Sequence, residues 1–158
     1  MAKKRAVTSE ARQRLVVAAD RLFYQDGIRS VGIDRVIAEA GVAKMTLYAH
    51  FPSKDDLILA VLQHREEQIM EFFRAAMERR AGRTKNKIQA FFAALKDWFK
   101  SPKFRGCAFQ NAAVELAAPD HPATQFVRDH KRRFAIMLRG LVEESLGTGA
   151  SKVAQSIT

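Results

Sequence analysis

Apolar residues recur along this chain at the three- and four-residue spacing of α-helices, and no segment alternates apolar and polar residues over the length of a strand. Glycine and proline are scarce, with 8 and 4 among 158 residues, which leaves room for long helices and disfavours a turn-rich β fold. The first apolar stripe follows one helical face of residues 9–25 and consists of Leu15, Val16, Ala18, Ala19, Leu22 and Phe23. The pattern predicts an all-α protein.

Turn signals divide the sequence into seven predicted helices. We expect them over about 9–25, 32–40, 44–50, 54–80, 85–100, 106–118 and 122–146. Thr8 or Ser9 is expected to cap the first helix, and Gly41 is expected to end the second, because glycine readily takes the left-handed conformation of a helix C-terminus. Ser53, with the acid Asp56 three residues later, has the pattern of a capping box.

The charge balance narrows the class of partner. The chain carries 27 Lys and Arg against 17 Asp and Glu, and residues 1–54 hold 10 of the basic and 5 of the acidic side chains, starting with a basic arm of Lys3, Lys4 and Arg5. This balance favours an anionic partner, nucleic acid first and a membrane surface second. A single cysteine, Cys107, excludes an intramolecular disulfide and a cysteine-rich zinc site, and no apolar run approaches the ~18 residues of a membrane span.

The first three predicted helices have the lengths and spacing of a helix-turn-helix unit. The second and third are joined by Gly41-Val42-Ala43, where the glycine lets the chain reverse direction. The third helix is expected to expose Lys44, Met45, Thr46, Tyr48 and His50 on one face. A helix of this size fits the DNA major groove with its N-terminal residues toward the base edges. Its lysine, threonine, tyrosine and histidine side chains offer donors to phosphate oxygens.

The same segments closely resemble the DNA-binding domain of TetR-type regulators, over about residues 9–68. The residues that carry the resemblance are Ser30-Val31, Ala40-Gly41-Val42, Thr46-Leu47-Tyr48-Ala49-His50-Phe51 and Ser53-Lys54-Asp55-Asp56-Leu57. A weaker resemblance links Arg105-Gly106-Cys107-Ala108-Phe109 and Asn111-Ala112-Ala113-Val114-Glu115-Leu116 to the ligand-domain segment of one subgroup.

The resemblance implies a cytoplasmic transcriptional repressor that binds a palindromic operator as a dimer and is released by a small-molecule effector. It implies a DNA-binding domain over 9–69, with the helix-turn-helix at about 32–51, joined by a long fourth helix to a helical effector-binding domain over 70–158. By matching positions, Ala43, Lys44, Met45 and Thr46 would approach bases. Phosphates would be held by Ser30, Tyr48, His50 and Lys54.

The resemblance also leads to a prediction about dimerisation. Proteins of this type have two further helices that form the four-helix bundle of the dimer, whereas only 11 residues follow Gly147 here. Either the chain is truncated, or it dimerises through another surface, or it dimerises poorly. The prediction is a C-terminally shortened effector domain and weak dimerisation.

Aromatic residues of the later helices are the candidates for an effector pocket. Phe91, Phe92, Trp98, Phe99 and Phe109 are most simply core residues, but helix bundles also bind ligands between their helices. The expected pocket residues are Phe72, Trp98, Cys107 and Phe109. Cys107 is also open to interpretation as a small buried hydrophobic residue or as a redox sensor.

No catalytic, cofactor or metal site is predicted. The chain has no phosphate-cradling glycine loop, no HExxH pair and no convincing pair of nucleophile and base, and His64, His121 and His130 are too far apart in sequence to indicate a metal site. Two alternatives remain open. One is a helical small-molecule-binding protein or enzyme with a vestigial helix-turn-helix, and the other is a membrane-surface protein that uses basic amphipathic helices.

Overall fold

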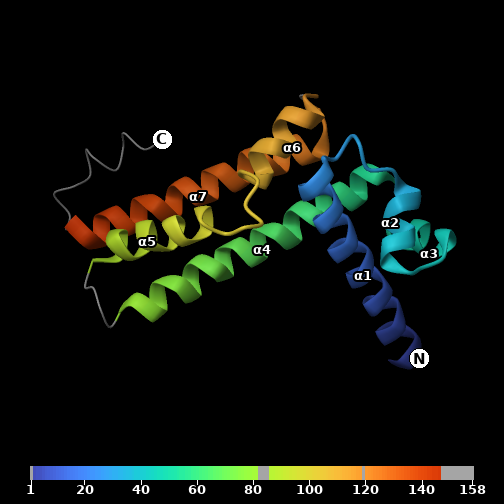
Figure 1. Ribbon diagram of the computed structural model, residues 1–158, viewed down its shortest axis with the longest axis horizontal. Helices are drawn as coiled ribbons and strands as arrows, with labels where there is room; N and C mark the ends of the chain where they lie inside the picture. Colours follow the sequence, from blue (N-terminus) through green and yellow to red (C-terminus); the bar gives the residue numbers. More distant parts are fainter. Residues whose placement is uncertain (1, 82–85, 119, 147–158) are drawn as a thin grey trace. The chain divides into compact units, whose positions relative to one another are not determined.

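The computed structural model describes residues 2–81, 86–118 and 120–146, and these ranges contain α-helices and no β-strand. The helices, labelled in Figure 1, are α1 (Ala2–Asp26), α2 (Ile33–Ala40), α3 (Lys44–His50), α4 (Lys54–Ala81), α5 (Lys87–Phe99), α6 (Ala108–Leu116) and α7 (Pro122–Leu146). The predicted all-α class is confirmed. Gly82 and the residues from Gly147 to the C-terminus lie outside the described residues.

The start of α1 corrects the sequence prediction. The helix begins at Ala2, so Thr8 and Ser9 lie inside it, and the expected basic arm belongs to its first turns. Alanine, lysine and arginine are strong helix formers, and a helix that has nucleated gains a hydrogen bond for each residue added. The N-cap preference of Thr8 and Ser9 was therefore a misleading signal.

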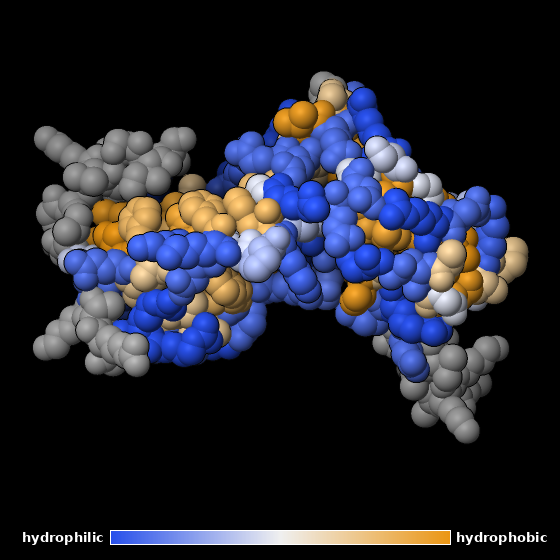
Figure 2. Space-filling view, in the orientation of Figure 1, coloured by the Kyte–Doolittle hydropathy of each residue, from blue (hydrophilic) through white to orange (hydrophobic). Residues whose placement is uncertain are grey.

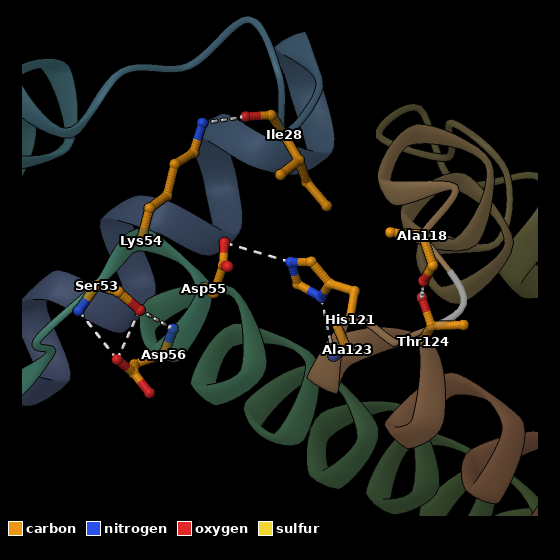
Figure 3. A network of polar contacts seen from close by, with 9 residues as sticks. All are labelled: Ile28, Ser53, Lys54, Asp55, Asp56, Ala118, His121, Ala123 and Thr124. Carbon is orange, nitrogen blue, oxygen red and sulfur yellow. Dashed lines mark hydrogen bonds and ion pairs between the residues drawn. The ribbon is translucent and has the colours of Figure 1, made fainter.

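The other helix ends follow local signals. Gly41 is left-handed, with φ 63° and ψ 43°, and ends α2 as predicted. The capping box also forms, because the Asp56 N–H donates to Ser53 Oγ at 3.1 Å and the Ser53 N–H donates to Asp56 Oδ2 at 2.9 Å (Figure 3). The α6 helix is shorter than expected because Gly106 and Ala117, at φ 89° and 42°, leave the right-handed helical region.

The chain divides into two compact units. Unit 1 comprises Met1–Arg65 with Arg105–Val127, and unit 2 comprises Glu66–Phe104 with Arg128–Thr158. The helices α4 and α7 contribute residues to both units, and all of α6 belongs to unit 1. The functional division into 9–69 and 70–158 stays a prediction.

Unit 1 has an apolar core built from its helices and the turns between them. Its largest fully buried side chains are Leu15, Val16, Leu22, Val31, Val36, Leu47, Leu57, Ile58 and Phe109. The stripe predicted for the first helix is buried, from Leu15 at 0% exposed to Phe23 at 6%. The helix α1 contacts both α2 and α3, so the helix-turn-helix packs against α1 in the core of this unit.

Unit 2 is organised around Phe73 of α4. Its ring centre lies 5.0 Å from that of Phe91 and 6.0 Å from that of Trp98, and Phe134 of α7 packs against the same cluster. A buried polar contact joins α4 to α7 in this unit, since Glu66 Oε1 lies 2.8 Å from the His130 ring nitrogen Nδ1.

One face of α5 is exposed where the sequence predicts core residues. Phe92 and Phe99 are among the predicted core residues, yet they are 61% and 53% exposed, whereas Phe91 is 3% exposed. Because α5 carries apolar residues on more than one face, helical spacing cannot tell which of them packs inward. Figure 2 shows apolar surface over α5 and α7.

Two kinds of feature are absent from the described residues. None of the helices there has the length and apolar character needed to cross a bilayer. Nor does that part of the chain contain a group of three or more His, Cys, Asp or Glu that could hold a metal ion. His121 lies 3.3 Å from Asp55, and His130 faces Glu66.

Candidate nucleic-acid interface

The turn between α2 and α3 is built by hydrogen bonds at the end of one helix and the start of the next. The Gly41 N–H donates to the Ala38 carbonyl and the Val42 N–H to the Ile37 carbonyl, each at 3.3 Å. Ala43 is then extended, with φ −74° and ψ 150°, and its carbonyl accepts from the Thr46 N–H at 2.9 Å. The result is a helix-turn-helix in which α3 covers the predicted range of 44–50.

One face of α3 is buried and another is exposed. Leu47 is 0% exposed and anchors the helix in the core of unit 1, and Phe51 at its end is 3% exposed. Since a helix repeats every 3.6 residues, burial of Leu47 leaves residues on other faces accessible, and Met45 is 80% exposed. Of the four predicted base contacts, Ala43, Lys44 and Met45 are exposed and Thr46 is half-buried.

Lys44 opens α3 and carries an exposed ion pair. Its Nζ lies 3.2 Å from Asp34 Oδ1 on α2, and the hydrogen bond to Asp34 raises the pKa of Lys44 above its ordinary value. Both side chains are more than half exposed, at 60% and 85%, so the pair contributes little to stability. Lys44 can therefore exchange Asp34 for another acceptor at small cost.

Three of the predicted phosphate contacts lie at or near the surface of unit 1. Ser30 is exposed in the turn between α1 and α2, and Tyr48 is 43% exposed on α3. His50 is half-buried, and its ring centre lies 6.3 Å from that of Phe51. All three side chains are donors of the kind that bind phosphate oxygens.

Lys54 has an intramolecular partner that the sequence did not indicate. Its Nζ donates to the Ile28 carbonyl at 2.6 Å, as Figure 3 shows, and lies 5.8 Å from the centre of the Phe23 ring. Partial burial lowers the pKa of Lys54, while the nearby carboxylates of Asp55 and Glu115 oppose that shift. Lys54 thus ties the first turn of α4 to the turn that follows α1.

The comparisons with known proteins agree with this geometry. Residues 15–61 match the family described as "Bacterial regulatory proteins, tetR family". A TetR-family transcriptional regulator from Streptomyces coelicolor has a similar structure, with a TM-score of 0.78 and 39% sequence identity over 93% of this chain and 77% of that chain. This chain belongs to the TetR family.

Other relatives of this chain are less similar in sequence or match a shorter region. A TetR transcriptional regulator from Chloroflexus aurantiacus has a TM-score of 0.78 and 26% identity over 96% of this chain and 80% of that chain. The HTH-type transcriptional activator FasR from Mycolicibacterium smegmatis is 36% identical over 86 residues, which are 52% of this chain. The matched residues span only 39% of FasR and 29% of an HTH-type transcriptional regulator from Staphylococcus aureus.

In this TetR-family chain, a partly buried ion pair joins α1 to α4 within unit 1. Arg65 donates from Nε and Nη2 to the two carboxylate oxygens of Asp20, at 2.6 and 2.7 Å, and the two side chains are only 17% and 15% exposed. The Arg65 guanidinium also lies 4.1 Å from the centre of the Tyr24 ring. Sequence reasoning missed this pair, because its members are 45 residues apart and neither belongs to a motif.

Two contacts attach the segment around α6 to α1 within unit 1. The Tyr24 hydroxyl donates to the Gly106 carbonyl at 2.8 Å and accepts from the Arg105 N–H at 2.9 Å. Glu115 Oε2 accepts from the Arg29 N–H at 3.0 Å. The only signal for these contacts in the sequence was the weaker resemblance of the segments 105–109 and 111–116.

The four expected pocket residues divide between the two units. Phe72 and Trp98 pack against the Phe73 cluster of unit 2, whereas Cys107 precedes α6 and Phe109 is buried in unit 1. A small cleft in unit 1 is lined by residues of α1, α4 and α6 and by Ile28, but Cys107 and Phe109 are not among its lining residues. The effector pocket of this TetR-family protein stays a prediction.

Proposed function

We propose that this chain is a DNA-binding transcriptional regulator that represses transcription from a palindromic operator and is released by a small-molecule effector. The observation that carries the proposal is the outward face of α3, where Lys44 and Met45 project from a helix-turn-helix of the TetR family. Its action on a genome places it in the cytoplasm. We assign it no catalytic activity, in keeping with a family of regulatory proteins.

The proposed base contacts come from the first turn of α3. Lys44 Nζ can donate to the acceptor edge of guanine in the major groove, because its present partner Asp34 is an exposed and exchangeable one. Ala43 and Met45 offer apolar contact to thymine methyl groups, and Thr46 offers a hydroxyl. These four residues would supply the sequence preference within one half-site.

The proposed phosphate contacts surround that helix. Ser30, Tyr48 and His50 each offer a single donor, while the Lys54 ammonium has three and uses one on the Ile28 carbonyl. Lys54 can therefore keep its internal bond and still donate to a phosphate. Such contacts make affinity depend steeply on salt, because each neutralised phosphate releases counterions.

Regulation requires a second half-site and a place for the effector. Two recognition helices must lie about 34–36 Å apart to enter successive major grooves, which requires a dimer. Residues 70–158 are proposed as the effector-binding and regulatory domain, with Phe72 and Trp98 as the pocket candidates in unit 2 and Cys107 and Phe109 as those in unit 1.

The proposal is tested by selecting genomic fragments with the purified protein and footprinting the fragments it retains. We expect one palindromic sequence to be enriched and two half-sites, one helical turn apart, to be protected. Failure of the protein to bind DNA in a salt-dependent way would overturn the proposal. Turnover or binding of a small molecule without DNA binding would instead support the vestigial helix-turn-helix.

A further inference from the structure

We propose that Glu115 of α6 is a positioning residue for the DNA interface. Its carboxylate holds the turn between α1 and α2 in the conformation that presents Ser30 and Lys54 to phosphates. This inference rests on the proposed function, and it goes beyond it by giving a residue far from the helix-turn-helix a part in DNA binding.

The first observation is a hydrogen bond across 86 residues of sequence. The Arg29 N–H donates to Glu115 Oε2 at 3.0 Å, so the last turn of α6 reaches the backbone of the turn that follows α1. A carboxylate that accepts from a backbone N–H makes a charge-assisted bond, which is stronger than a bond between neutral groups. Glu115 is thus a specific clamp on this turn.

The second observation is that the turn is shaped to receive the carboxylate. Gly27 has a φ of 88°, and a Cβ placed there would lie 3.1 Å from Glu115 Oε2. The missing side chain therefore leaves room for the carboxylate beside the backbone. Gly27 also ends α1, because its φ of 88° leaves the right-handed helical region, although its N–H still donates to the Phe23 carbonyl at 3.0 Å.

The third observation links the clamp to the proposed phosphate contacts. Ile28, between Gly27 and Arg29, supplies the carbonyl that accepts from Lys54 Nζ at 2.6 Å. Ser30 directly follows Arg29. Glu115 and Lys54 therefore hold adjacent residues of one short turn, and release of the turn by Glu115 would loosen both proposed phosphate donors.

The negative charge of Glu115 by itself should weaken DNA binding rather than strengthen it. A carboxylate near a surface that binds phosphates repels DNA, so its removal should strengthen binding if it has no other role. If Glu115 positions the turn, loss of its reach should weaken binding instead. The two effects can be separated by substitutions that change reach and charge independently.

Glu115→Asp keeps the charge but shortens the side chain by one methylene, so that its carboxylate no longer reaches the Arg29 N–H. Glu115→Gln keeps the length and an acceptor oxygen but removes the charge. A matched control is Tyr24→Phe, which removes the other attachment of this segment, at Gly106 and Arg105, and leaves the turn untouched. All three changes are small, and thermal unfolding of the full chain reports whether each variant folds.

The experiment measures binding of the full chain to the footprinted operator duplex by fluorescence anisotropy over a series of salt concentrations. We expect Glu115→Asp to weaken binding about three- to tenfold, as the loss of one hydrogen bond implies, and to lower the salt slope by about 1. Glu115→Gln should bind at least as tightly as the wild type, and Tyr24→Phe should match the wild type. Amide exchange at Arg29, read by NMR without DNA, should speed up in Glu115→Asp but not in Glu115→Gln.

Other results would contradict the proposal that Glu115 positions the DNA interface. If Glu115→Asp binds as tightly as the wild type, or if Glu115→Gln and Tyr24→Phe lose as much affinity as it does, Glu115 does not position the interface. Unchanged exchange at Arg29 in Glu115→Asp would show that the bond does not hold the turn. If the wild type itself binds no DNA, the proposed function falls, and this inference falls with it.

Discussion

Substitution of Gly27 by alanine should destabilise the protein more than the same change at Gly41. Both glycines have a positive φ, 88° and 63°, so an alanine is strained at either position. The left-handed conformation costs a residue with a Cβ about 1–2 kcal/mol, and the stiffer unfolded chain offsets about 0.4–1 kcal/mol of that. For Gly41, where nothing lies within 4 Å of the new Cβ, the net loss should be about 1 kcal/mol.

Gly27 carries an additional cost because a Cβ there would lie 3.1 Å from Glu115 Oε2. The Glu115 side chain is flexible and can move away, but it then gives up its bond to the Arg29 N–H. The bond is exposed, so its loss should add about 1 kcal/mol, below the ~1.5–3 kcal/mol of bonds to charged groups. We therefore expect Gly27→Ala to cost about 2 kcal/mol, twice the cost of Gly41→Ala.

Urea unfolding of the full chain, followed by far-ultraviolet circular dichroism, measures both losses. A second comparison adds Gly27→Ala to a Glu115→Ala background, where the additional cost should vanish and the loss should fall to about 1 kcal/mol. Equal losses for the two glycines would refute the reasoning. So would an excess loss at Gly27 that persists without Glu115, because the carboxylate would then not be its cause.

Three further results are expected. Lys54→Ala should weaken binding to every DNA sequence and lower the slope of log affinity against log salt by about 1, and an unchanged slope would remove Lys54 from the phosphate contacts. Lys44→Ala should relax the preference at one base pair per half-site, at about 1–3 kcal/mol, whereas an equal loss on random DNA would make Lys44 a phosphate contact. Arg65→Ala should cost about 3 kcal/mol in urea unfolding, because it leaves Asp20 charged and poorly solvated. Arg74→Ala, which removes exposed ion pairs with Glu71 and Glu78, should cost about 0.5 kcal/mol or less, and similar losses for the two variants would contradict this.

The features that sequence reasoning predicted correctly depend on residues close together in the chain. The left-handed end of α2 needs only the glycine at position 41, and the start of α4 needs only Ser53 and Asp56. The range of α3 followed from the same kind of signal, together with the resemblance to a known DNA-binding domain. Its exposed face followed from the position of Leu47, because helical geometry relates the two.

The wrong predictions arose where local signals compete. Thr8 and Ser9 can cap a helix, but the residues before them also favour helix, and α1 extends back to Ala2. Phe91 and Phe92 are adjacent and equally apolar, yet only Phe91 is buried. Which of the two packs inward depends on the position of α4 and α7 around α5, which no spacing within α5 records.

The sequence by itself determined the helical class, most of the turns and the helix-turn-helix, because each of these follows from interactions within one or two helical turns. Only the tertiary structure decided which distant groups meet: Lys54 with the Ile28 carbonyl, Arg65 with Asp20, and Glu115 with the Arg29 N–H. These partners are 26, 45 and 86 residues apart. Their contacts exist because packed helices bring side chains together across the core, and that packing is a property of the whole unit rather than of any one segment.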